Sequence, residues 1–267
     1  MSYVETDDFA EKEAVVEYMR ECLGDSFETL WQRNGLEIGG SGGILAGLLS
    51  GHLKSIISTD IADTAMTYDG QFPYLLKEKF KRNGRNINLG KVQFLWADAQ
   101  NLPFRDNWFE FVVSLNAFEH IPDPAAALSE ILRVTKPGGL IYIRFDPVWT
   151  ADSGSHFLSR IGAPWQHLLS DDSEIDVMMS VDGATDYEVN SYKSDMNRHP
   201  VSYYREMLPR VTERGRGTFL WYNIYDGCVD QSYPSHPNRA LAAARLGCDP
   251  DDLLIRGFEL LIQRNAE

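Results

Sequence analysis

Short apolar runs alternate with helical patterns through the first half of this chain, and this alternation limits the possible folds more than any other feature of the sequence. The five runs with the apolar and β-branched content of buried strands are Leu36 to Ile38, Ser55 to Thr59, Val92 to Trp96, Phe109 to Leu115 and Leu140 to Phe145. Helical patterns stand between them. Such a chain is expected to fold as a doubly wound α/β sheet with helices on both faces.

The rest of the sequence extends this unit rather than adding a second one. A chain of 267 residues is long enough for one large domain, or for one domain with an insertion. Residues 1–33 contain one amphipathic candidate helix, a lead-in to the alternating half at 34–146. Residues 147–200 show no sustained period and are interpreted as an insertion after the fifth strand. We predict that residues 201–267 complete the same sheet, so that 1–267 form one domain.

Charge and composition restrict the partners and the compartment. The net charge of −14, from 39 acidic against 25 basic residues, repels phosphate backbones and anionic lipids. We therefore expect neither nucleic acid nor a membrane as partner; a basic patch around Arg205 to Arg216 is the one place that would favour RNA. Three widely spaced cysteines, an acidic N-terminus and no long apolar run predict a cytoplasmic protein. The sequence indicates no oligomeric state.

A glycine-rich loop, Gly39 to Gly43, follows the first strand and precedes a helical pattern. Such loops let the backbone approach a ligand closely and direct helix N–H groups at negative charge. The dinucleotide pattern GxGxxG fails in both registers, and no Lys-Ser/Thr pair follows Gly47 as a P-loop requires. What remains is the acidic Glu37 followed by small residues at alternate positions. This pattern can receive the ammonium and carboxylate groups at the methionine end of S-adenosylmethionine.

The segment Leu36 to Gly43 resembles motif I of class I S-adenosylmethionine-dependent methyltransferases, and the resemblance continues in order along the chain. Asp60 resembles the family's acidic residue that accepts hydrogen bonds from both ribose hydroxyls. Asp98 resembles the aspartate that accepts from the adenine amino group. Phe109 to Pro124 is similar to the fourth strand and the loop below the methyl donor, and Arg133 to Gly139 to the turn into strand five.

This resemblance covers roughly residues 35–146 and implies a type 11-like small-molecule methyltransferase. The implied fold is a Rossmann-like seven-stranded sheet with helices on both faces, whose last strand runs antiparallel. The implied cofactor is S-adenosylmethionine. The residues expected to bind it are Glu37, Gly39, Gly40, Ser41, Gly43, Asp60, Ile61, Asp98, Ala99 and Asn116.

The methyl acceptor leaves fewer marks in the sequence. We expect a small-molecule hydroxyl, as in a sugar or natural product, with nitrogen, sulfur or carbon acceptors as alternatives. A nucleoside-binding scaffold without transfer activity is an alternative of another class. His120 and His167 are candidate bases because imidazole titrates near neutral pH. Trp149 and Trp165, just after the fifth strand, are candidates for the acceptor pocket, and no His/carboxylate spacing indicates a metal site.

Overall fold

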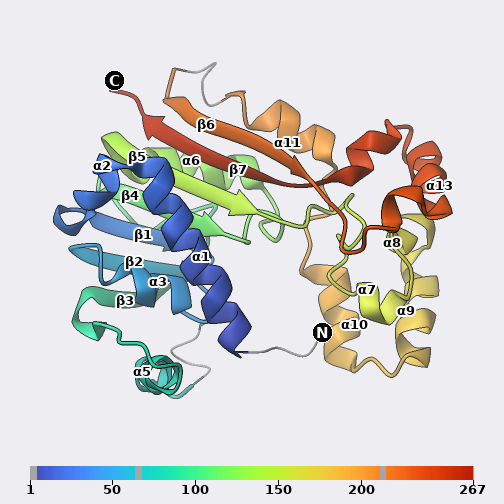
Figure 1. Cartoon of the computed structure of the whole chain (residues 1–267), viewed down its shortest axis with the longest axis horizontal. Coiled ribbons are helices and arrows are strands. Elements are labelled where there is room, and N and C mark those ends of the chain that lie inside the picture. The colour runs from blue at the N-terminus through green and yellow to red at the C-terminus, as the bar shows by residue number, and fades with distance from the viewer. Residues whose placement is uncertain (1–4, 64–67, 211–214, 267) are drawn as a thin grey trace.

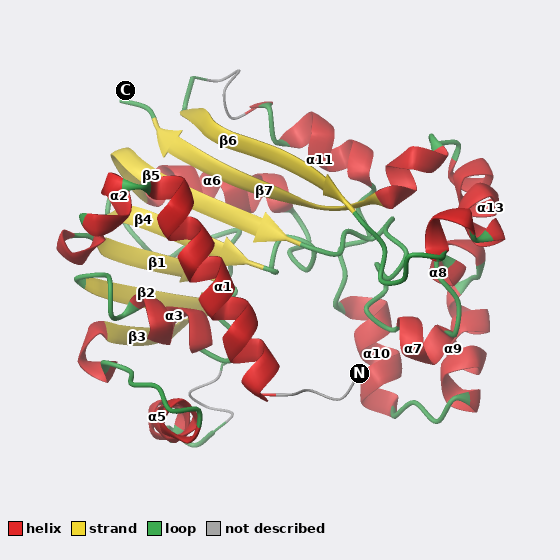
Figure 2. Ribbon diagram, viewed as in Figure 1, coloured by secondary structure: helices red, strands yellow, loops and turns green. Residues whose placement is uncertain are grey.

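The computed structural model places a mixed sheet between layers of helices, with a further helical unit at one end (Figures 1 and 2). It describes residues 5–63, 68–210 and 215–266. Seven strands of the described chain form one sheet in the order β3-β2-β1-β4-β5-β7-β6. They are β1 (Asn34–Ile38), β2 (Ser55–Asp60), β3 (Val92–Trp96), β4 (Phe109–Leu115), β5 (Thr135–Phe145), β6 (Gly217–Asp226) and β7 (Ile255–Arg264).

The strand directions confirm the expected fold. Strands β1 to β5 pair in parallel, and β7 runs antiparallel between β5 and β6. Helices α1 and α3 lie on one face and α6 and α11 on the other (Figure 1). The helices outside 147–200 are α1 (Glu5–Leu23), α2 (Asp25–Glu28), α3 (Ile44–Leu49), α5 (Phe72–Arg82), α6 (Pro124–Val134), α11 (Val201–Met207) and α13 (Pro237–Leu246). No helix in the described part of the chain combines the length and apolarity that a membrane span requires.

Alternate residues along the strands enter two hydrophobic cores on opposite faces of the sheet. On β4, Phe111 and Val113 join the core beneath α1 and α3, whereas Val112 joins the core beneath α6. On β5, Tyr142 joins the core beneath α1 and α3, and Ile141 joins the core beneath α6. Each fully buried side chain of this size contributes about 1.5–3 kcal/mol. The double burial holds the strands rigidly, and with them the loops at their carboxyl ends.

Residues 147–200 are called the helical segment below. They are helical, whereas the sequence predicted an irregular insertion. They contain four short helices, α7 (Leu158–Ile161), α8 (Gln166–Leu169), α9 (Asp172–Val181) and α10 (Asp186–Ser194). Helices α9 and α10 begin with capping boxes, Asp171 with Glu174 and Thr185 with Glu188. The segment lies beyond the arrowheads of β4 and β5 (Figure 1). Its helices are short and their apolar faces are narrow, so hydrophobic periodicity alone did not reveal them.

Candidate active site

The glycine loop lies where β1 ends, and β2 holds it there. The backbone N–H groups of Gly39 and Gly40 both donate to the carbonyl oxygen of Thr59, each at 2.9 Å. Gly39 has φ 73°, in the left-handed region that favours glycine. A Cβ atom at Gly39 would collide with the Ala117 side chain, and one at Gly40 with Ser58. The loop therefore requires glycine at both positions.

Glu37, the predicted acidic residue of this motif, lies under the loop. Its side chain is buried, and the Ser58 hydroxyl donates to its Oε2 at 2.5 Å. Burial raises the pKa of Glu37 to about 7, and the nearby Asp60 carboxylate adds to the shift. A Cβ atom at Gly40 would lie 2.7 Å from the same Oε2. The carboxyl group thus supports the loop from beneath.

Asp60 ends β2 and faces the glycine loop. Its two carboxylate oxygens accept hydrogen bonds from the backbone N–H groups of Ser41 and Ala62, each at 2.8 Å. The next residue, Ile61, is 65% exposed, and its carbonyl oxygen accepts from the indole N–H of Trp96 at 2.7 Å. A fixed carboxylate therefore stands beside an exposed apolar side chain, which suits a ribose and its base.

Asp98 and Ala99 follow β3, and Asn116 follows β4. The Oδ1 of Asp98 accepts from both the backbone and the side-chain nitrogen of Gln100, at 2.8 and 3.0 Å. Asn116 has φ 50°, and its backbone N–H donates to the carbonyl oxygen of Arg144 at 2.8 Å. Its Oδ1 is buried without a hydrogen-bond partner among the described residues. An unpaired buried acceptor destabilises a fold by about 1–3 kcal/mol, so the assignment of Asn116 to a ligand donor stays a prediction that this atom favours.

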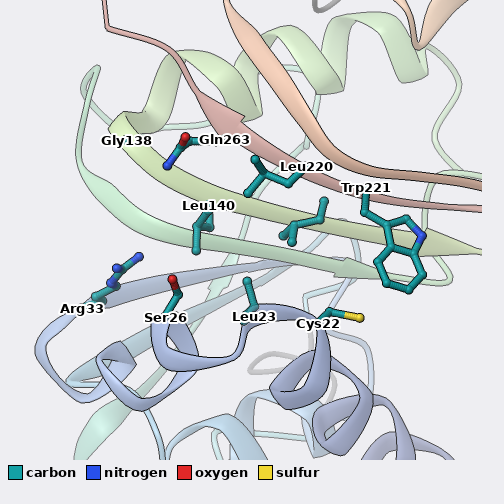
Figure 3. Close-up of a pocket in the computed structure, with 10 residues that line it drawn as sticks. Cys22, Leu23, Ser26, Arg33, Gly138, Leu140, Leu220, Trp221 and Gln263 are labelled. Carbon is teal, nitrogen blue, oxygen red and sulfur yellow. The ribbon is translucent and has the colours of Figure 1, made fainter.

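The sequence-predicted cofactor residues thus gather at one edge of the sheet. Strands β3, β2, β1 and β4 are neighbours and parallel, so their carboxyl ends meet there. A separate cavity of about 170 Å³ is lined by the end of α1 and by residues of β5, β6 and β7, including Cys22, Leu140 and Trp221 (Figure 3). It includes Arg33, which precedes β1, so it lies at the opposite edge of the sheet from the glycine loop.

His120 stands in the loop after β4, beside Glu119 and His156. Its Nδ1 lies 2.8 Å from the carbonyl oxygen of Asp195, and its Nε2 lies 4.0 Å from Oε1 of Glu119. Glu119 is fully buried, which raises its pKa well above the ordinary value. The His156 ring packs edge-on against His120 with centroids 5.0 Å apart. Nothing in the sequence links Glu119 to His156, since only the folding of the helical segment brings them together.

Two residues that we expected on the acceptor side are packed elsewhere. Trp165 has no exposed surface, lies in a core with α13, and donates its indole N–H to the carbonyl oxygen of Leu253 at 3.3 Å. His167 is also buried, with its Nε2 2.8 Å from the carbonyl oxygen of Trp149. Burial lowers the pKa of His167 to about 4. Both expectations are corrected: these side chains build the interior of the helical segment.

Trp149 remains the aromatic candidate nearer the surface. It is partly buried, and the Arg198 guanidinium lies 4.8 Å from its ring centroid. Its ring also packs against His167, with centroids 4.8 Å apart. Trp149 therefore connects the interior of the helical segment to Arg198, and its place at the acceptor stays a prediction.

The geometry agrees with what comparisons with known proteins show. Residues 36–143 match a family model described as a methyltransferase domain. A demethylmenaquinone methyltransferase from Staphylococcus saprophyticus is 33% identical over 91 residues, which is 34% of this chain and 34% of that protein. The chain therefore matches about a third of the length of this curated relative. The residues that the family model matches, 36–143, include the glycine loop and Asp60.

Solved structures extend the likeness to the whole fold. A SAM-dependent methyltransferase from Methanosarcina mazei has a TM-score of 0.52 and 20% identity, covering 90% of this chain and 96% of that one. Geranyl diphosphate C-methyltransferase from Streptomyces coelicolor, solved with S-adenosylhomocysteine, has a TM-score of 0.53 and 13% identity, covering 95% and 79%. At these identities the likeness shows the fold alone. Residues 36–143 therefore resemble a methyltransferase domain, and the chain shares the fold of solved methyltransferases that use S-adenosylmethionine.

Proposed function

We propose that this chain transfers a methyl group from S-adenosylmethionine to a hydroxyl group of a small molecule, such as a sugar or natural product. The observation that carries the proposal is the convergence of Asp60, Asp98 and Asn116 with the glycine loop at one edge of the sheet. Ligands of doubly wound sheets bind outside the carboxyl ends of the strands. The helical segment stands beyond β4 and β5, on the side where an acceptor would bind (Figure 1).

The residues present fit the cofactor. Gly39 and Gly40 let the loop pack closely against Ala117 and Ser58, which fixes its backbone, and the unpartnered Oδ1 of Asn116 can accept from a ligand N–H. The Asp60 carboxylate accepts two backbone hydrogen bonds and keeps lone pairs for two ribose hydroxyls. Ile61 offers apolar surface to the base. When bound, S-adenosylmethionine supplies a methyl group already activated on a sulfonium, so the protein's task is alignment and the exclusion of water.

His120 is the proposed acceptor of the hydroxyl proton. A backbone carbonyl oxygen can only accept, so the His120 nitrogen facing Asp195, Nδ1, carries the hydrogen. In the neutral ring, Nε2 then holds the lone pair that a general base needs. Since His167 is buried and bonded to Trp149, it is given no part in the reaction.

A small acceptor is in keeping with the net charge of −14, which disfavours a nucleic acid. The odd number and wide spacing of the three cysteines favour the cytoplasm as the site of action. Nitrogen, sulfur and carbon acceptors remain alternatives within the same reaction class. The proposed acceptor and compartment concern the whole protein, whereas the curated relative matches only about a third of this chain.

Methyl transfer from isotopically labelled S-adenosylmethionine to acceptor panels grouped as hydroxyls, amines, thiols and carbon nucleophiles tests the proposal. We expect label in the hydroxyl group. Calorimetric titration of S-adenosylhomocysteine, NAD and ATP runs in parallel, and only the first is expected to bind. Binding without transfer to any panel would contradict the proposed activity and favour a scaffold. Comparable binding of NAD would contradict the cofactor assignment.

Replacing Asp60 tests the ribose contact directly. Asp60→Ala should weaken S-adenosylhomocysteine binding by about 2 kcal/mol, or about 30-fold, the scale of hydrogen bonds to a charged group. Part of that loss is indirect, because the Asp60 carboxylate also accepts the backbone N–H of Ser41 and so holds the glycine loop in place. Asp60→Asn keeps one acceptor oxygen and serves as the matched control, with a smaller loss. Unchanged affinity in a folded Asp60→Ala variant would remove this residue from the site.

A further inference from the structure

Three potential metal-ligating side chains meet at the end of β4. Glu119, His120 and His156 each offer one ligand atom, and these atoms all lie within 4.8 Å of one another. Two come from the loop after β4 and the third from the helical segment. His156 has φ 63°, an uncommon conformation for a residue other than glycine. The backbone there holds the imidazole toward the other two groups.

The Glu119 carboxyl group gives an independent sign of a missing partner. The side chain is completely buried, and neither oxygen accepts a hydrogen bond from another residue of the described chain. The nearest nitrogen, Nε2 of His120, is 4.0 Å away, which is too far for a hydrogen bond. Burial without a charged partner disfavours the ionised form of this carboxyl group, whereas a cation at this point would stabilise it.

The His120 imidazole is arranged as a metal ligand usually is. The Nδ1–H of His120 donates to the carbonyl oxygen of Asp195 at 2.8 Å, which fixes the ring and leaves the Nε2 lone pair toward Glu119. Such a bond from the far nitrogen orients most histidine ligands in proteins. Asp146 adds negative charge nearby, although its own oxygens bond Tyr225 and Arg256 at 2.5 and 3.2 Å. Asp146 is therefore a supporting charge rather than a fourth ligand.

We propose that Glu119, His120 and His156 bind one divalent transition-metal ion of the zinc type. Two imidazoles and one carboxylate form the donor set of open zinc sites, and this set selects against magnesium, which prefers oxygen ligands. Three protein ligands leave a coordination position for water or for a hydroxyl. The ion would occupy the Nε2 lone pair of His120, so metal binding and the role of this imidazole as a base exclude one another. A hydroxyl at the open position would instead be activated by the ion.

The binding test uses the full chain without an affinity tag and without S-adenosylmethionine, so its outcome is independent of methyl transfer. Zinc is titrated in competition with a chromophoric chelator. We expect one ion per chain, and no competition from magnesium. Cobalt should occupy the same position and give the visible absorption of a low-symmetry nitrogen and oxygen site.

Variants decide whether the three residues hold the ion. Glu119→Gln and His156→Asn should each weaken zinc binding at least about tenfold, because even outer-shell changes have effects of this size. His199→Asn is the matched control, since His199 bonds the carbonyl oxygen of Pro122 outside the cluster, and it should leave binding unchanged. Glu119→Gln removes a buried carboxylate without a change of volume, so this variant should fold even if the histidine variants do not. The absence of saturable zinc binding, or equal binding by Glu119→Gln and the unaltered chain, would overturn the proposal.

Discussion

At the carboxyl edge of the sheet, backbone N–H groups fix the functional side chains in place. In the helical segment, by contrast, bonds between side chains hold the helices together. Asp60 is fixed by two backbone N–H groups, and Gly39 has no room for a side chain. In the helical segment, Arg160 bonds Glu188 and Asp182 at 2.9 and 3.2 Å and so joins α7, α10 and the end of α9. Such exposed pairs contribute little to stability, because water and salt screen their charges.

This difference predicts how the two regions respond to change. An added atom at the edge of the sheet meets a backbone that two cores hold on both faces, so its effect should reach the whole fold. In the helical segment, the loss of one contact should loosen one helix. The exception is the interior that the segment shares with α13, where a single large side chain fills the space.

Trp165→Ala tests that exception and should have the largest effect. Trp165 has no exposed surface, so its truncation leaves a cavity and should lower the free energy of unfolding by about 4 kcal/mol. Urea unfolding measures the loss. Tyr187→Ala is the matched control, because Tyr187 lies on α10 and is 78% exposed. A stable Trp165→Ala variant that had lost only turnover would instead place this indole at the acceptor.

Gly39→Ala tests the edge of the sheet. The new Cβ would collide with Ala117 at φ 73°, which combines overpacking of about 1–3 kcal/mol with left-handed strain of about 1–2 kcal/mol. We expect the free energy of unfolding to fall by about 3 kcal/mol. Gly84→Ala isolates the strain, because Gly84 has φ 69° and open space around it. Equal losses in the two variants would show that the loop tolerates a side chain.

The two regions should also respond oppositely to pH, beginning with His167. Burial lowers its pKa from 6.5 to about 4 in the folded protein. Between these values the unfolded chain binds a proton that the folded chain does not, so stability present above pH 6.5 is lost as the pH falls. The contribution is about 3 kcal/mol. His167→Gln should remove this part of the acid slope, measured by unfolding from pH 7 to pH 4.

Glu37 gives the opposite slope at the edge of the sheet. Burial raises its pKa from 4.5 to about 7, so between these values the folded protein keeps a proton that the unfolded chain has released. Its contribution to stability is therefore present below pH 4.5 and lost as the pH rises to about 7. Glu37→Gln should abolish that loss, which is again about 3 kcal/mol. If both variants changed the slope of stability between pH 4.5 and 6.5 in the same direction, the assigned shifts would be wrong.

The sequence predicted the sheet more accurately than the helical segment. The strand over Phe109–Leu115 is predicted at its observed bounds, because a run of mostly apolar residues, interrupted only by Glu110 and Ser114, is typical of a strand buried in a parallel sheet. The cofactor residues at the strand ends followed from the resemblance to the methyltransferase family, and the strand order brings them together. In the helical segment, hydrophobic periodicity is weak, yet the pairs Asp171 with Glu174 and Thr185 with Glu188 do mark helix starts.

The approach of Glu119 to His156 could not have been predicted in this way. It depends on how the helical segment returns to the loop after β4, where Asn197 bonds the carbonyl oxygens of Phe118 and Ile121 at 2.7 and 2.8 Å. Contacts of this kind join residues that are far apart in the chain and have no local pattern. Burial of Trp165 was missed for a related reason, since its partner α13 comes much later in the sequence.

The smallest predicted effect concerns one capping box, and it shows most directly whether the helical segment loosens locally. The Thr185 hydroxyl accepts from the backbone N–H of Glu188, whose carboxylate in turn accepts from the backbone N–H of Thr185. Thr185→Ala removes the first bond and should weaken α10 by about 1 kcal/mol. Hydrogen exchange should then quicken in α10, with the amides of β4 and β5 unchanged. Thr185→Ser keeps the cap and is the control; equal quickening throughout the sheet would mean that segment and sheet unfold as one unit.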